Sequence, residues 1–387
     1  MDTIKATRHF TYSLFLLTGG LAIAYTVSGV LVNEIIESFG LAGAEQGYMT
    51  SLLNIGSTIA LVSTIALRWK LKKTSMLALS GFLAAAMMAL TGLSASFHML
   101  LAVSLVLGFG LAWMDSYVNS CVVDANPEGS AKHQGTLHGC YGIGALISPV
   151  VIASLLGQNS WQKVYLLFAS VILATVVVYM IALRATGKFI TVSGMEPTKF
   201  SGSEIRLYLK QRKSVYLLLA CQTYTIMQFG LFTWLVRYMS VRHGTEAMGM
   251  AGISVMWAFI AISRFIAPRL PVDSMKLHAY GAFAAGATLL AGVVSDNPWV
   301  MCVMVGAGAL TSGHSIPTLF NKSVVTYEGN SLLPTSAMIL TTRISGMVVP
   351  PLLGLISVHS MQMSMIVPAI AALASGVCGL ALIGQKG

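Results

Sequence analysis

The sequence predicts an all-α integral membrane protein, with twelve transmembrane helices in two six-helix bundles related by pseudo-two-fold symmetry. Three observations predict this fold class. The 387-residue chain is 56% hydrophobic and only 9% charged, whereas a soluble domain carries about 25% charged residues. Long apolar runs recur along the whole sequence. A polar segment near the middle divides these runs into two equal groups.

Each apolar run is long enough to cross a bilayer, which takes about 20 residues of helix. The runs do not show the ten-residue alternation of a membrane barrel, and lipid offers no partner to an unpaired strand edge. The predicted spans, in order along the chain, are 9–33, 46–67, 75–95, 99–123, 134–157, 161–183, 214–239, 247–267, 276–295, 299–321, 332–356 and 361–383.

The basic residues predict the orientation of these spans. With the N-terminus inside, most of the 23 Lys and Arg residues fall in cytoplasmic loops, as the positive-inside rule requires. This distribution explains the net charge of +10 without nucleic acid as a partner. We therefore expect both termini in the cytoplasm, a multi-pass protein of the plasma (bacterial inner) membrane, and the lipid bilayer and a small-molecule solute as partners.

The longest non-membrane segment predicts the domain boundary. Residues 185–213 are expected to be a cytoplasmic linker between an N-terminal bundle at 1–184 and a C-terminal bundle at 214–387. Within the linker, the basic stretch Ile205–Lys213 has helical spacing, which is typical of a helix at the membrane surface.

The two halves share local patterns. Gly108-Phe109-Gly110 in span 4 recurs as Gly306-Ala307-Gly308 in span 10, and Arg68 at the end of span 2 has a counterpart in Arg264 at the end of span 8. Six-helix repeats related by an axis along the membrane normal are a transporter architecture.

Asp115 lies inside span 4, where a carboxylate costs several kcal/mol. Such acids face a polar pathway more often than lipid, which indicates transport. Asn119 lies four residues further on and shares its helix face. Gly108 and Ala112 extend this face with small side chains, so we expect it to form a cavity wall. The alternative is a carboxylate that holds neighbouring helices together.

Three cationic or titratable side chains lie in other spans. His138 opens span 5, where an imidazole near a carboxylate can share its proton. His314 lies one position from the internal-repeat equivalent of Asp115, so the two are expected to face one cavity. Arg343 in span 11 keeps its charge and must meet an acid, a carbonyl, an anionic substrate or water. The alternatives are a helix cap for His138 and backbone pairing for Arg343.

Span 7 combines amide and aromatic side chains, among them Tyr224 and Gln228. Amides bond hydroxyl groups and rings cover apolar C–H faces, so this pair suits a hydroxylated solute. Interfacial anchoring is the alternative for the aromatic residues. Further candidates to line the cavity are Tyr25, Asn54 and Trp113.

The run Gly110–Asn119, followed by His138–Ala145, resembles the fucose permease group of the major facilitator superfamily. The resemblance implies two bundles around a central cavity, alternating access, a monomer, and proton or sodium coupling at the acid of span 4. The chain departs from that group in two places. Residues 26–30 of span 1 carry no acid, and the loop at 68–73 keeps its basic charges without one.

We therefore expect a secondary active transporter of a small polar solute, a sugar or similar polyol, coupled through Asp115. The alternative is a proton-coupled transporter or exporter of a carboxylated or zwitterionic metabolite or drug, which His314 and Arg343 favour. The sequence shows no metal-binding His-Glu pattern, nucleophile elbow or phosphate-binding loop. No enzyme activity, metal or resident cofactor is expected, and a sensor would need a larger soluble domain.

Overall fold

The computed structural model describes residues 3–67, 72–126, 130–156, 159–186, 202–327 and 332–384, which are almost entirely helical. The chain divides into two compact units. The first consists of Met1–Phe39 and Leu52–Pro197, and the second of Gly40–Ser51 and Thr198–Gly387. Arg68 and residues 187–201 of the expected linker lie outside the described residues.

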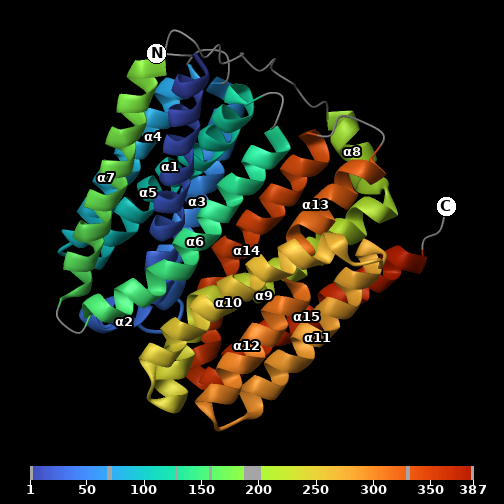
Figure 1. Cartoon of the computed structure of the whole chain (residues 1–387). Helices are drawn as coiled ribbons and strands as arrows, with labels where there is room; N and C mark the ends of the chain where they lie inside the picture. Colours follow the sequence, from blue (N-terminus) through green and yellow to red (C-terminus); the bar gives the residue numbers. More distant parts are fainter. Residues whose placement is uncertain are drawn as a thin grey trace. The chain divides into compact units, whose positions relative to one another are not determined.

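The helices that build the first unit are labelled in Figure 1: α1 (Thr3–Val30), α2 (Val32–Phe39), α3 (Glu45–Leu67, from Leu52 on), α4 (Lys73–Gly92), α5 (Phe97–Ala125), α6 (Ser130–Leu156) and α7 (Trp161–Thr186). Helix α1 packs against α6 and α7, and α4 packs against α5 and α7. Tyr179 of α7 joins three helices, because its ring meets Phe10 of α1 and its hydroxyl donates to the Thr74 carbonyl of α4 at 2.9 Å.

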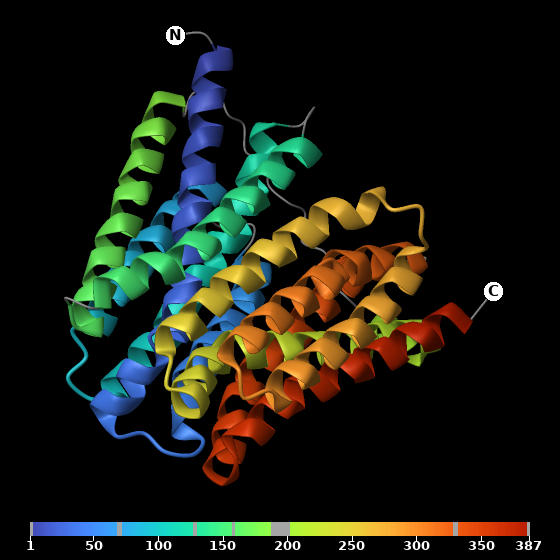
Figure 2. The same ribbon diagram turned by 60° about the horizontal axis from the view of Figure 1, so that its bottom comes forward.

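The second unit consists of the start of α3 together with α8 (Gly202–Lys210), α9 (Arg212–His243), α10 (Glu246–Ile266), the 3-10 turn η2 (Ala267–Arg269), α11 (Ser274–Val294), α12 (Pro298–Ser312), α13 (Ser315–Thr326), α14 (Leu332–His359) and α15 (Met361–Gly384). Helix α9 packs against α10, α14 and α15, and α11 packs against α12 and α15. These helices appear from yellow-green to red in Figure 2. One core cluster includes Leu217, Cys221, Met275 and Leu319.

The predicted spans are confirmed as helices with small shifts in their ends. Eleven helical segments of the described chain are long and apolar enough to cross a membrane. The predicted span 46–67 corresponds to α3, which carries Asn54 and several Ser and Thr residues and is not among the eleven. Large apolar side chains such as Leu173, Val177 and Ile181 remain exposed on α7, as the outer face of a membrane helix requires.

The predicted span 299–321 corresponds to one apolar segment, Pro298–Thr326, which is interrupted by a turn. The structure separates α12 from α13 at Gly313 and His314. Pro317 has no backbone N–H, so the Gly313 carbonyl four residues earlier loses its helical partner. The Nε atom of Arg264 on α10 donates to that carbonyl at 3.3 Å. The break is thus stabilised by a side chain from a neighbouring helix.

A second proline effect explains why the start of α3 groups with the second unit. Pro351 in α14 cannot donate to the Met347 carbonyl, and the hydroxyl of Ser51 donates to it instead at 2.5 Å. Gly47 permits the close approach, since a Cβ atom there would lie 2.2 Å from the Pro350 backbone. The first turns of α3 are therefore anchored on α14.

The repeated glycines have matching packing roles within each unit. A Cβ atom at Gly108 would meet the Leu53 backbone of α3, and one at Gly306 would meet Val255 of α10. Likewise Gly110 lies against Ala84 of α4, while Gly308 lies against α11. Spans 4 and 10 thus contact spans 2 and 8 through the first glycine, and spans 3 and 9 through the second. This correspondence supports an internal repeat.

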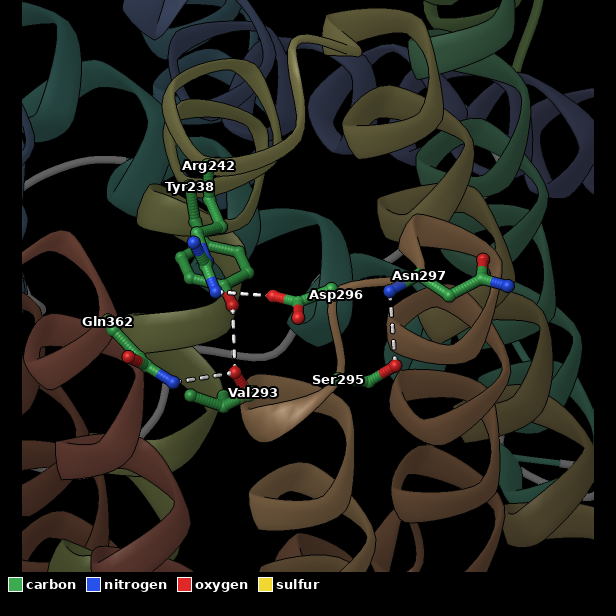
Figure 3. A network of polar contacts seen from close by, with 7 residues as sticks. All are labelled: Tyr238, Arg242, Val293, Ser295, Asp296, Asn297 and Gln362. Carbon is green, nitrogen blue, oxygen red and sulfur yellow. Dashed lines mark hydrogen bonds and ion pairs between the residues drawn. The ribbon is translucent and has the colours of Figure 1, made fainter.

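The C-terminal end of α11 and the loop that follows it are joined to two other helices of the second unit (Figure 3). Tyr238 of α9 and Gln362 of α15 both donate to the Val293 carbonyl, at 3.2 and 3.1 Å. Arg242 of α9 also pairs with Asp296 at 2.5 Å, but the Asp296 side chain is 86% exposed. Exposed ion pairs contribute at most about 1 kcal/mol to stability. The two hydrogen bonds to the Val293 carbonyl are therefore the main links between α11 and these helices.

Candidate functional site

Asp115 and Asn119 lie together on α5, as their spacing predicts. The Nδ2 atom of Asn119 donates to Asp115 Oδ1 at 3.0 Å and to the Asp115 carbonyl at 2.9 Å. Both side chains are half-buried. The carboxylate therefore has an amide donor inside a membrane span, and hydrogen bonding to the charged form offsets part of its desolvation.

Gly108, one of the small residues on this face of α5, has a packing role in the structure. Gly108 does not leave space for a cavity wall, because a Cβ atom there would lie 1.9 Å from the Leu53 carbonyl oxygen. Ser57 of α3 also donates to the Gly108 carbonyl at 3.0 Å. The glycine is needed for close packing of α3 on α5, a contact that helical spacing alone does not indicate.

Trp113 also joins α3 to α5 in the structure. Its indole Nε1 donates to the Ala60 carbonyl at 3.1 Å and to the Ser63 hydroxyl at 2.9 Å. The ring is buried and packs on the Phe109 ring in a tilted arrangement, with centroids 4.3 Å apart. Its one polar hydrogen is used in this contact, which supports the position of α5, and its part in solute binding stays a prediction.

The remaining candidates of the first unit occupy three different helices. Tyr25 is half-buried on α1, and Asn54 is buried on α3. His138 is exposed and lies in the first turn of the apolar segment Thr136–Leu156 on α6. Because α6 packs against both α1 and α5, these side chains belong to the same group of helices as Asp115. Their part in solute binding stays a prediction.

Tyr224 and Gln228 come together in the second unit, as expected for residues one turn apart. They line a cavity of about 10 Å³ among α9, α10, α11 and α12, which also includes Met256 and Ser312. That volume admits about one water molecule. The two polar side chains therefore share a small internal cavity, and a larger solute requires these helices to separate.

His314 lies at the break between α12 and α13, where it is 3% exposed. Its backbone N–H donates to the Ser263 hydroxyl at 3.1 Å, and the same hydroxyl lies 3.2 Å from its Nδ1. Within the described chain, the buried Nε2 atom has no hydrogen-bond partner. His314 thus belongs to a polar cluster inside the second unit. Whether it shares a cavity with Asp115 of the first unit stays a prediction.

A second buried histidine completes this cluster and was missed by the sequence analysis. His278 of α11 is fully buried, with Nδ1 2.9 Å from the Ser315 hydroxyl and Nε2 3.5 Å from the Ser375 hydroxyl. Ser375 itself donates to the Ala220 carbonyl of α9 at 2.8 Å. A sequence signal existed, because a histidine within an apolar span needs polar partners.

Arg343 is half-buried on α14. Its guanidinium has neither a hydrogen bond nor an ion pair with any residue in the described ranges. Neighbouring Ser345 is used structurally, since Gln222 of α9 donates to its hydroxyl at 2.6 Å. All the N–H donors of this guanidinium are therefore left to bond an anion or water.

A family model for the Major Facilitator Superfamily matches residues 14–333. The chain belongs to the major facilitator superfamily. It is therefore a multi-pass membrane transporter and not an enzyme. The resemblance seen in the residues of spans 4 and 5 is confirmed at the level of the superfamily.

Similar proteins of this superfamily carry different solutes. The glucose/mannose transporter GlcP of Bacillus subtilis (strain 168) is 22% identical over 326 residues, which cover 82% of this chain and 78% of GlcP. Among solved structures, a bacterial homolog of the human lysosomal transporter Spinster has a TM-score of 0.79 and 15% identity, covering 99% of this chain and 98% of that one.

Two further solved structures share this fold. The transporter FucP, in its outward conformation, has a TM-score of 0.65 and 18% identity, covering 96% of this chain and 98% of its own. The peptide transporter POT has a TM-score of 0.79 and 14% identity, covering 100% and 98%. At these identities the likeness establishes the major facilitator fold and leaves the solute open.

Proposed function

We propose that this major facilitator chain is a secondary active transporter of a small polar solute, a sugar or similar polyol. It works by alternating access in the plasma (bacterial inner) membrane, with proton or sodium coupling through Asp115. The observation that carries the proposal is the half-buried Asp115 carboxylate within a membrane span, held by the Asn119 amide at 3.0 Å. If Asp115 only held helices together, an apolar residue of similar size would do so without the free-energy cost of burying a charge.

Coupling follows from the cost of a charge that loses its water. A bare Asp115 carboxylate is tolerated while water reaches it and is unfavourable once its surroundings dry. A proton or a bound cation removes that penalty. The ion therefore shifts the balance between the conformations by its differential affinity for them.

The polar groups near Asp115 suit a hydroxylated solute. Because Asn119 uses its Nδ2 for Asp115, its Oδ1 is available to accept from a solute hydroxyl. Within the second unit, Tyr224 and Gln228 separately place a phenol and an amide in their own small cavity. GlcP is described as a glucose/mannose transporter, which supports hexoses as the first solutes to test.

The proposal is tested with purified protein in sealed vesicles. Uptake of labelled hexoses, polyols, amino acids and organic acids is measured under an imposed proton gradient, an imposed sodium gradient, or neither. We expect one or more hexoses or polyols to accumulate only when one of the two gradients is present. Accumulation of none of these sugars, with each solute tested up to millimolar concentration, contradicts the proposal.

A second candidate function is transport or export of a carboxylated or zwitterionic solute. The observation that favours it is the half-buried Arg343 guanidinium, which has no partner in the described chain. Arg343→Gln decides between the two candidates. An anion transporter loses binding by about tenfold or more with the charge-assisted bonds, whereas a neutral-sugar transporter changes little. Arg242→Gln, at an exposed ion pair, is the matched control.

A further inference from the structure

A cavity of about 420 Å³ lies at one end of the first unit. It is formed by the beginning of α1, the end of α5 and the beginning of α6, and it is lined by Thr7, Arg8, Thr11, Tyr12, Phe15, Asn126 and His133. Its volume is within the usual range of about 300–1,000 Å³ for small-molecule sites. The predicted topology places this end of the unit in the cytoplasm.

Arg8 is held in a defined position at this cavity. Its Nε atom donates to the Tyr12 hydroxyl at 2.7 Å, and its guanidinium carbon lies 5.3 Å from the centre of the Tyr12 ring. Nothing among the described residues bonds to its two Nη groups. The planar fork is thus oriented in advance, with donors left for a carboxylate or phosphate.

The other lining residues add polar groups and aromatic faces. The rings of Phe15 and His133 stack with centroids 6.4 Å apart. Asn126, directly after the end of α5, donates to the Thr11 hydroxyl of α1 at 3.0 Å, which joins these two polar lining residues. None of the seven lining residues is acidic. The cavity therefore combines cationic character with surfaces that suit the ring or C–H face of an organic molecule.

We propose that this cavity is a binding site for an organic anion, a phosphate ester or a carboxylate, whose organic part packs on the aromatic side chains. The guanidinium of Arg8 binds the anionic oxygens, and Tyr12 and Phe15 contact the organic part. The phosphate comes from a cytosolic metabolite or from the headgroup of an anionic phospholipid. A ligand here contacts α1, α5 and α6 together and therefore slows any rearrangement of these helices. This kinetic consequence depends on the proposed transport cycle. The binding itself is independent of that cycle.

Binding is tested on the purified full-length protein by calorimetric titration and by thermal stabilisation, since a ligand of the folded state raises its apparent stability. The probes are inorganic phosphate, a hexose 6-phosphate and the parent hexose. We expect saturable binding of the hexose phosphate, weakened about tenfold or more by Arg8→Gln. Tyr12→Phe, which removes the hydroxyl bonded to Arg8, weakens it less. Arg206→Gln, at an exposed arginine of α8, leaves it unchanged.

A second experiment distinguishes a lipid headgroup from a soluble metabolite. It measures the thermal stability of the protein in nanodiscs of phosphatidylcholine with or without phosphatidylglycerol. Stabilisation by phosphatidylglycerol that Arg8→Gln abolishes, without binding of the hexose phosphate, assigns the site to a lipid headgroup. Binding of the hexose phosphate in phosphatidylcholine alone assigns it to a soluble metabolite. Absence of both effects, or an equal loss in Arg8→Gln and Arg206→Gln, overturns the proposal. Each readout is independent of transport, so failure of the proposed function leaves this test unaffected.

Discussion

Asn119 donates through one atom, Nδ2, to both the carboxylate and the backbone carbonyl of Asp115, at 3.0 and 2.9 Å. The two bonds fix the amide over the acid on one face of α5. They also separate the two polar ends of the Asn119 side chain, with the donor committed to Asp115 and the acceptor left for a solute. The pair therefore joins the proposed coupling group to the proposed solute contact.

Asn119→Ala tests this arrangement. Loss of the acceptor and of the donor that orients Asp115 is expected to raise the solute KM about tenfold, in keeping with one or two lost hydrogen bonds. Solute exchange at saturation should persist. The control is Asn159→Ala, because Asn159 makes a similar bond to the Leu155 carbonyl but has no carboxylate in that bond. Equal KM values for wild type and Asn119→Ala would remove Asn119 from the site.

The ion pair between Lys73 and Asp124 predicts a stability effect. The Nζ and Oδ2 atoms are 2.7 Å apart, and the side chains are only 11% and 12% exposed. Asp124→Asn leaves a largely buried ammonium without its counter-charge and should cost about 2 kcal/mol. The double variant Lys73→Gln with Asp124→Asn should regain part of that loss. Thermal unfolding in detergent measures both, and additive losses would show that the pair is not coupled.

The contact between α3 and α5 predicts a large effect for a small substitution. A Cβ atom at Gly56 would lie 1.8 Å from the Leu105 carbonyl oxygen. Gly56→Ala should therefore separate the helices and cost about 1–3 kcal/mol. Gly139→Ala on α6 meets nothing within 4 Å and should be neutral or stabilising by up to about 1 kcal/mol. Similar melting temperatures for the two variants would contradict the packing described for α3.

Ser263 predicts a cost at the break between α12 and α13. Its hydroxyl partners both the backbone N–H and Nδ1 of His314. Ser263→Ala leaves buried polar atoms unpaired, which should cost about 1–3 kcal/mol. Ser170→Ala serves as control, because the exposed Ser170 hydroxyl bonds only to its own helix and such surface changes stay within about 0.5 kcal/mol. An unchanged melting temperature for Ser263→Ala would show that the break has another support.

Helical spacing and hydropathy were sufficient to predict the helical class, eleven of the twelve spans as apolar membrane segments, and the pairing of Asp115 with Asn119. These features depend on residues three or four positions apart or on runs of about 20 residues, which the sequence displays directly. The interruption of span 10 was missed, although Pro317 marked the carbonyl that loses its partner. A proline near the middle of an apolar run leaves a backbone carbonyl without its helical N–H partner, as a helix end does, so another donor has to be identified for that carbonyl.

Other features could not be read from a single helix. The use of Gly108 and Trp113 to pack α5 on α3, and of Ser51 to bond the Met347 carbonyl, depends on the register between helices distant in sequence. Helical periodicity shows on which face of its helix a residue lies, but not which other helix packs against that face. The same limit explains why His278 was missed, since its partners come from α13 and α15.

The most direct test of the proposed coupling compares Asp115→Asn with wild type in the same vesicles. The amide has the shape of the acid and retains an oxygen for Asn119, but it cannot carry a proton or a negative charge. We predict that exchange of labelled solute across the membrane persists, while accumulation against a gradient is lost. Asp296→Asn, at an exposed acid, should retain both. Undiminished uphill accumulation by Asp115→Asn would contradict the role of Asp115 as the coupling group.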